Sequence, residues 1–278
     1  MLVGATPKLF PSNENPKRFK SCFGASAEVL ARVFQQLEEF DIDTERNLDS
    51  FLLCCFWLKN YDTEMVLAVR FGMSEKEIRR WLWFYAECLK ELSTALIRLI
   101  PEDFDDRIAL PMVVDGTHCM IYEPMHDLYP MDSDYYSHKH HTACYAYQVT
   151  ISTTESKILS LHGPYPAGKY NDKVMWKESG VQDLMVDNGK RAIADGGYEG
   201  VPGVAVPIRR YHSQTTNIYF RRNRARVERT MGFLKNFRIL ANTFRVRKNR
   251  LIRHEQVFRA VGAIVATQLK EESSLFDV

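Results

Sequence analysis

The feature that most constrains this 278-residue chain is a change of hydrophobic spacing close to Pro101. Before that residue, apolar side chains recur about every 3.6 positions, as in AEVLARVFQQL at 27–37, which is typical of amphipathic helices. After it come short runs rich in Val, Ile and Tyr and bounded by Gly, Pro or Asn, which is typical of strands. These runs are LPMVVDGTHCMIY (110–122), CYAYQVTIST (144–153), KILSLHGPY (157–165), KRAIADGGY (190–198) and VAVPIRR (204–210). The order predicts an all-helical head followed by an α/β domain.

The predicted domains follow from this change. Residues 1–20 carry three prolines and are expected to form an extended arm. We expect the helical domain at 21–100 and the α/β domain at 108–272. Further helices are expected at 171–185, 217–240 and 254–271.

The segment from 61 to 92 is typical of a helix-turn-helix. Ala68 is small enough for two helices to pack closely, and Gly72 follows where the turn needs a positive φ. Ser74 begins the second helix, and Glu77 three residues later completes a capping box. These offsets favour the DNA-binding motif, and an ordinary helical hairpin is the alternative.

The second of these two helices predicts a core face and a DNA face. Ile78 and Trp81 are expected to face the core. Lys76, Arg79 and Arg80 then lie on the outer face, where they would contact phosphates or bases.

Charge is distributed unevenly along the chain, although its net value is only +2. Residues 38–50 and 102–106 are acidic, whereas residues 207–253 contain fourteen Lys and Arg and a single acid, Glu228. A solvated helix face normally mixes both signs, so that neighbouring turns attract one another. The imbalance indicates a polyanionic partner, with a merely solvated basic surface as the alternative.

Cysteines and apolar runs bear on location. The six cysteines form no CxxC pair, which indicates reduced, mostly buried thiols. No apolar signal region precedes residue 30. The longest apolar run, FLLCCFWL at 51–58, is shorter than the about 20 residues that a bilayer requires. We expect a soluble, intracellular protein with no membrane partner.

Three acids are candidates for chemistry. Asp115 ends the apolar run VVDG, Asp195 ends AIADGG, and Glu228 stands alone among cations. Carboxylates at the ends of buried strands are costly unless they are paired, hydrogen-bonded or bound to metal. If all three converge, they would hold two Mg²⁺ or Mn²⁺ ions, which prefer oxygen ligands. Such a pair of ions stabilises both the attacking and the leaving oxygen of a phosphodiester.

Each of these acids also has a simpler interpretation. Asp115 and Asp195 could be turn formers ahead of glycine, and Glu228 could pair with Arg224 or Arg221 on its own helix.

Other polar residues are weaker candidates. His138, His140 and His141 suggest zinc, but no Cys or His follows at finger-like spacing, so a polar strand entry is favoured. His118 is interpreted as a hydrogen-bonded core histidine, and Asp172 as a helix cap.

Five stretches together resemble the Harbinger-type DDE transposases, which are related to bacterial insertion-sequence transposases. They are VVDGTH (113–118), YYSHKHH (135–141), GPYPAGKYND (163–172), ADGGYEG (194–200) and RARVERTMGFLKNFRIL (224–240). The resemblance implies a ribonuclease H-like catalytic core behind the helix-turn-helix domain. It also implies that Asp115, Asp195 and Glu228 are the catalytic, metal-binding triad.

The resemblance extends to an R-x3-E-x6-K signature at Arg224, Glu228 and Lys235. Arg224 and Lys235, together with Arg221, are expected to contact DNA phosphates. Two departures stand out: Arg221 occupies the place of a tyrosine, and only 32 residues separate Asp195 from Glu228.

These observations predict a metal-dependent DNA endonuclease and strand transferase with two divalent ions. Its expected partners are double-stranded transposon ends and target DNA, a second copy of itself, and an accessory DNA-binding protein. The resemblance implies a nuclear location in a eukaryotic host. The alternatives are a domesticated, non-catalytic DNA-binding protein and a structural helical-bundle protein with an incidental basic surface.

Overall fold

The computed structural model describes residues 15–42, 45–105, 107–123, 133–207, 214–246 and 250–272. The chain divides into two compact units. The helical unit holds the residues up to Leu96 together with Phe233–Asn242 and Ile252–Glu271. The sheet unit holds Ile97–Gly232 and Thr243–Leu251. The two compact units therefore do not match the predicted linear domain boundaries, because two segments late in the chain belong to the helical unit.

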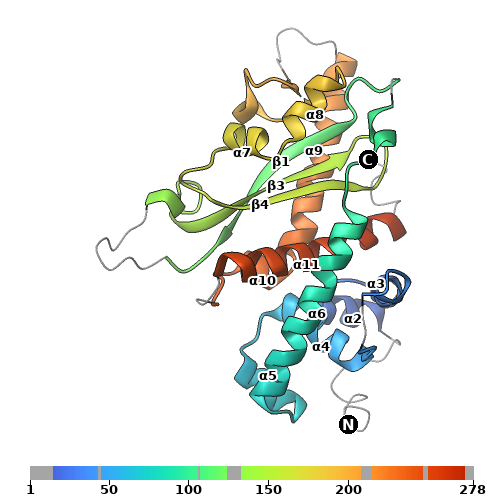
Figure 1. Ribbon diagram of the computed structural model, residues 1–278, viewed down its shortest axis with the longest axis vertical. Coiled ribbons are helices and arrows are strands. Elements are labelled where there is room, and N and C mark those ends of the chain that lie inside the picture. Colours follow the sequence, from blue (N-terminus) through green and yellow to red (C-terminus); the bar gives the residue numbers. More distant parts are fainter. Residues whose placement is uncertain are drawn as a thin grey trace. The chain divides into compact units, whose positions relative to one another are not determined.

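The helical unit is built from short amphipathic helices. They are α2 (Pro16–Phe23), α3 (Ala27–Glu39), α4 (Leu48–Asn60), α5 (Glu64–Phe71), α6 (Glu75–Leu96), α10 (Arg238–Ala241) and most of α11 (Arg250–Glu271) (Figure 1). Local side chains begin them: Ser26 accepts from the N–H of Val29 and Asn47 from that of Ser50. Within the described residues, no helix is both long and apolar enough to cross a membrane.

The predicted extended arm at 1–20 is wrong for its last residues. α2 begins at Pro16, where Asn15 accepts a hydrogen bond from the N–H of Arg18. Phe19 and Phe23, four residues apart, are both buried, so burial of this stripe stabilises the helix. Residues 1–14 lie outside the described part of the chain.

The two helices of the predicted helix-turn-helix form where the offsets placed them. Gly72 ends α5 with φ at 64°. The carboxylate of Glu77 accepts from the backbone N–H of Ser74 at 3.0 Å, and the N–H of Glu77 donates to the hydroxyl of Ser74 at 3.2 Å, completing the capping box. Ile78 is buried as predicted, whereas Trp81 is half-buried and stacks on Tyr85.

In the described residues of the sheet unit, six strands form one mixed sheet. Its strands are β1 (Met112–Met120), β2 (Tyr136–Ser137), β3 (Thr142–Ser152), β4 (Ile158–Pro166), β5 (Ala192–Ile193) and β6 (Val204–Ala205). The order is β2-β3-β1-β5-β6, and β4 also pairs with β3. β1, β3 and β4 are antiparallel, whereas β5 and β6 run parallel to β1. This arrangement confirms the predicted α/β fold with a ribonuclease H-like core.

Several predicted elements of the sheet unit are shorter than expected. The strand predicted at 190–198 keeps only β5, because Asp195 begins a 3-10 turn at Gly196–Tyr198. The helix predicted at 171–185 is two helices, α7 (Asp172–Glu178) and α8 (Val181–Asp187). They separate at Gly180, whose φ of 71° breaks the helix. The helix predicted at 217–240 divides into α9 (Gln214–Lys235) and α10.

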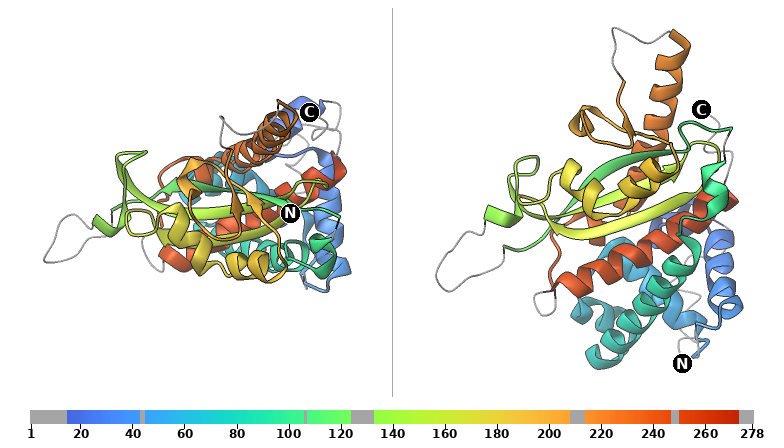
Figure 2. Two further views of the ribbon diagram at one scale, coloured as in Figure 1. Left: turned by 90° about the horizontal axis from the view of Figure 1, so that it is seen from above. Right: turned by 45° about the horizontal axis from the view of Figure 1, so that its top comes forward.

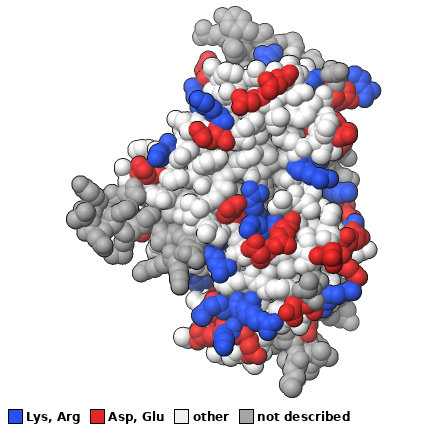
Figure 3. Space-filling view, viewed as in Figure 1, with Lys and Arg blue, Asp and Glu red and all other residues white. Residues whose placement is uncertain are grey.

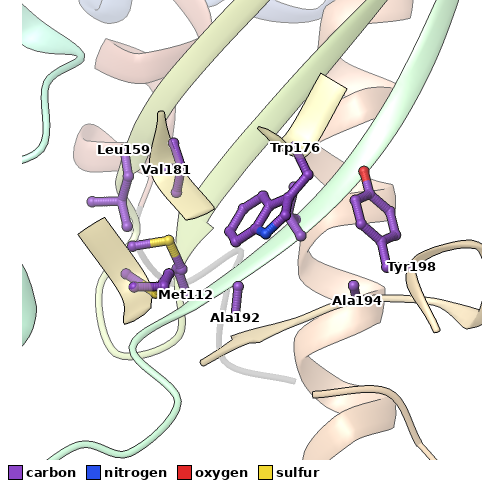
Figure 4. Packing of buried hydrophobic residues seen from close by; sticks show 9 residues of the cluster. Met112, Leu159, Trp176, Val181, Ala192, Ala194 and Tyr198 are labelled. Carbon is purple, nitrogen blue, oxygen red and sulfur yellow. The ribbon is translucent and has the colours of Figure 1, made fainter. Parts of the chain in front are cut away.

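A buried cluster lies between one face of the sheet and helices α7 and α8 (Figure 2, Figure 4). Met112 and Val114 of β1 contribute to it, and Trp176 of α7 is its largest member. Because strand residues alternate between faces, Gly116 points toward α7 and Asp115 toward the opposite face. The packing of α7 on this face decides what lies beside the Asp-Gly ends of the strands.

Candidate active site

Asp115 and Asp195 lie on neighbouring strands at the same edge of the sheet. β1 pairs with β5 in parallel, with Val113 opposite Ile193. Two residues further along each chain, the same register brings Asp115 beside Asp195. This is the edge at which the parallel strands of α/β proteins place their ligands.

A third carboxylate, Asp172, reaches the same edge from α7. A Cβ on Gly116 would lie 2.5 Å from its Oδ1, and a Cβ on Gly197 would lie 3.1 Å from its Oδ2. The two glycines therefore leave the space that the Asp172 carboxylate occupies. The helix cap expected of Asp172 is instead Asn171, whose side chain accepts from the N–H of Val174 at 3.0 Å.

Burial and like charges set the protonation of this cluster. Burial raises the pKa of Asp115 to about 6, opposed by its hydrogen bond from the N–H of Gly116 and increased by the charges of Asp195 and Asp172. Burial also raises the pKa of Asp172, with Asp195 adding to the effect and Lys139 opposing it. The cluster therefore carries more negative charge than its surroundings compensate.

Tyr198 lies close enough to the three carboxylates for their charges to act on it. Its hydroxyl accepts a hydrogen bond of 3.1 Å from the side-chain amide of Gln148, and both side chains are buried. Burial raises the pKa of Tyr198 well above its usual value, and the charge of Asp172 adds to the shift. The phenol therefore stays neutral beside the acids. Gln148 lies opposite Gly116 in the β1–β3 register, so this pair lies beside the residue that follows Asp115.

Glu228 lies apart from the three aspartates, on α9. Its carboxylate is 3.3 Å from a guanidinium nitrogen of Arg224, and its side chain is 59% exposed. Arg224 is also close enough to Asp115 to lower the pKa of that carboxyl. Arg224 therefore interacts with the charge of Glu228 and also with that of Asp115. Arg221, Arg224 and Glu228 together line a pocket of about 650 Å³, to which Pro207 also contributes.

The carboxylates of this site are chemically suited to bind a divalent cation. Their present arrangement, however, does not enclose one. Among the described residues, no three His, Cys, Asp or Glu side chains are positioned to enclose a metal ion. Yet a half-buried carboxylate whose pKa is raised to about 6 by burial and by two neighbouring acids is a group that a bound cation would stabilise. Oxygen-only ligands are those that Mg²⁺ and Mn²⁺ prefer.

The chain matches the model of a known protein family. A family model described as DDE superfamily endonuclease matches residues 114–266, more than half of the chain. The chain belongs to the DDE superfamily endonucleases. No curated protein and no solved structure matches it.

The matched region of this DDE superfamily chain contains Asp115, Asp172, Asp195 and Glu228. Sequence reasoning interpreted Asp172 as a cap because it stands at the start of a helix. The sequence contained one indication: a glycine follows Asp115 and another follows Asp195. A glycine at such a position indicates that another group approaches the backbone closely, but it does not indicate which group.

Lys235, the last residue of the predicted signature, has a local partner. Its ammonium donates to the carbonyl of Leu240 at 3.0 Å, and the side chain is half-buried. In this conformation its contact closes the turn between α9 and α10.

The histidines of the DDE superfamily chain act as polar groups beside β2. Nδ1 of His118 lies 2.8 Å from the hydroxyl of Ser137, in agreement with a hydrogen-bonded histidine. The rings of His118 and His140 are 6.0 Å apart. His138, His140 and His141 belong to no metal-binding group among the described residues.

The three cations predicted to contact DNA from α6 are exposed. Arg79 pairs with Glu64, and Arg80 lies 3.2 Å from a carboxylate oxygen of Glu45. Figure 3 shows basic and acidic side chains intermixed over α5 and α6. These pairs would have to open for the arginines to bind phosphates.

Proposed function

We propose that the protein is a metal-dependent DNA endonuclease and strand transferase. The observation that supports this most strongly is the gathering of Asp115, Asp172 and Asp195 at one strand edge, with two glycines leaving room for the third carboxylate. A structural role explains one buried carboxylate through its hydrogen bonds. It does not explain why Asp195 stands where its charge makes the ionisation of both Asp115 and Asp172 costlier.

In this proposal Asp115, Asp195 and Glu228 hold two Mg²⁺ or Mn²⁺ ions. The ions would supply Lewis acidity and lower the pKa of a bound water or of a DNA 3′-hydroxyl. Asp172 adds negative charge beside Asp115 and Asp195. Tyr198 and Gln148 hold the floor of the site, and their neutral hydrogen bond adds no competing charge.

Arg224 and Arg221 bind the phosphates of the substrate in this proposal. Arg224 now neutralises Glu228, so an arriving phosphate would take over the guanidinium and release the carboxylate. The same exchange would lower the positive charge near Asp115 just as a cation becomes its partner. Lys235 would contribute to phosphate binding only after leaving the carbonyl of Leu240.

Transposon ends and target DNA are the proposed substrates, and the Harbinger subtype, self-association and an accessory DNA-binding protein remain predictions. A domesticated DNA-binding protein is the second candidate. The Glu228–Arg224 ion pair favours it, because that pair keeps the carboxylate occupied in this conformation.

A nicking assay tests the proposal. Plasmid DNA carrying the element's own ends is incubated with Mg²⁺, Mn²⁺ or EDTA, using wild type and Glu228→Gln. We expect metal-dependent cuts at the element boundary, and their loss in the variant with DNA affinity nearly unchanged. Glu199→Gln, an exposed acid in the same unit, is the matched control. Cleavage by Glu228→Gln at the wild-type rate would refute the assignment, and specific binding without cleavage would favour the domesticated protein.

A further inference from the structure

A second pocket, in the helical unit, is lined by cations and amides. It has a volume of about 430 Å³, within the range of small-ligand pockets, about 300–1,000 Å³. Its lining comes from α2, from the end of α4 and from the start of α10. The described lining residues are Lys17, Lys20, Ser21, Lys59, Asn60, Asn236 and Arg238, and none of these is an acid.

Lys59 is held in a fixed place at the wall of this pocket. Its ammonium donates to the main-chain carbonyl of Asn236 at 2.8 Å and to the side-chain oxygen of Asn236 at 2.6 Å. An ammonium group has three N–H donors, so one is left for a ligand. Burial lowers the pKa of Lys59, and the charge of Arg238 lowers it further. The two cations thus face each other with no acid of the pocket lining between them.

Helix capping explains only part of this charge. Lys20 and Lys59 lie in the last turns of α2 and α4, where a cation offsets the exposed carbonyls. Lys17 lies in the first turn of α2, where the same rule makes a cation unfavourable. Lys17 and Lys20 are three residues apart, so both lie on one face of the helix, toward the pocket.

We propose that this pocket binds a phosphate group, either from the DNA backbone or from a small soluble phosphate. Four cationic side chains surround the ligand, and Lys59 approaches it from a position set by Asn236. If the source is DNA, the inference rests on the proposed function and adds a contact remote from the aspartates. If the source is soluble, it stands independently of that function.

Binding of pyrophosphate to the full chain, measured calorimetrically in EDTA, is the first test. The variant Lys17→Gln/Arg238→Gln removes two charges whose side chains make no hydrogen bond or ion pair with other described residues, so the fold should persist. Arg18→Gln is the matched control: it is exposed on the same helix and does not line the pocket. We expect the double variant to weaken binding by about tenfold or more, because charge-assisted contacts are the stronger class, and the control to leave it nearly unchanged.

A variant that keeps both charges but exchanges the two side chains sharpens the test. Lys17→Arg/Arg238→Lys should bind pyrophosphate nearly as wild type does. Absence of pyrophosphate binding by wild type, or an equal loss in Arg18→Gln, would overturn the proposal, because generic surface charge would then account for everything.

Duplex DNA binding, followed by fluorescence anisotropy in EDTA, distinguishes the two sources. Loss of DNA affinity in the double variant, together with competition by pyrophosphate, supports a backbone phosphate. Unchanged DNA affinity with lost pyrophosphate binding supports a soluble phosphate. Neither arm requires cleavage, so failure of the nicking assay and failure of this proposal are separate results.

Discussion

Burial disfavours the charged form of ionisable groups in both units of the chain, but the charges around those groups differ. In the helical unit His254 is fully buried, and burial lowers its pKa to about 3, so the ring is neutral at pH 7. In the sheet unit burial raises the pKa of Asp115 to about 6, and two further aspartates make its ionisation costlier still. A structural interior thus removes the charge, whereas the strand edge concentrates it. A group of like charges that the fold does not compensate is typical of a functional site.

The largest expected effect tests whether the charge gathered in the sheet unit serves a site. Asp172→Asn should lower cleavage and divalent-ion affinity about 10- to 100-fold, the usual cost of altering a group beside metal ligands. Asp183→Asn, an exposed acid in the first turn of α8, should change neither. Nicking rates and Mn²⁺ titration give the two readouts. Equal behaviour of the two variants would show that Asp172 is merely a buried acid.

A smaller effect tests the packing of the strand edge. Gly116→Ala would place a methyl group 2.5 Å from Oδ1 of Asp172, and overpacking of this kind costs about 1–3 kcal/mol. Gly196→Ala is the control, since no atom lies within 4 Å of the added Cβ. Urea denaturation of both variants measures the difference. If Gly116→Ala is as stable as Gly196→Ala, then Asp172 does not occupy the space beside Gly116.

The smallest effect is a difference in pH dependence between the units. His254 has a folded-state pKa below its unfolded value of 6.5, so its contribution to stability is lost as pH falls from 6.5 toward 3. Asp115 has a folded-state pKa raised from 3.8 to about 6, so its contribution is lost as pH rises through that window. Each group gives a slope of at most about 1.4 kcal/mol per pH unit, and the slopes have opposite signs.

Metal-free denaturation between pH 4 and 6 checks this opposition. In His254→Gln the contribution of Asp115 remains, so stability should fall as pH rises. In Asp115→Asn the contribution of His254 remains, so stability should rise as pH rises. If the units unfold in separate transitions, the two slopes should already differ in wild type. Slopes of the same sign in both variants would contradict the contrast between the units.

Most of the local structure was predictable, because its causes lie within a few residues. Ser74 and Glu77 form their capping box three residues apart, and Gly72 ends the preceding helix with a positive φ. The apolar runs before Asp115 and Asp195 were also visible in the sequence, but Asp115 does not end its strand, because β1 continues to Met120. The pairing of Glu228 with Arg224 was one of two local interpretations of that residue, and neighbours four apart on a helix can always adopt it.

The sequence by itself therefore determined most of the helices and strands, and which acids follow the apolar runs. Tertiary structure alone decided that Asp172 lies against Gly116, that Gln36 bonds Thr267 across 231 positions, and that Lys59 faces Arg238 in a common pocket. Local elements follow from spacings of two to four residues, which the chain displays openly. Contacts between distant segments depend on sheet register and helix packing, in which many apolar faces compete for the same partners. The spacing of residues in the sequence does not indicate which of these faces pack together.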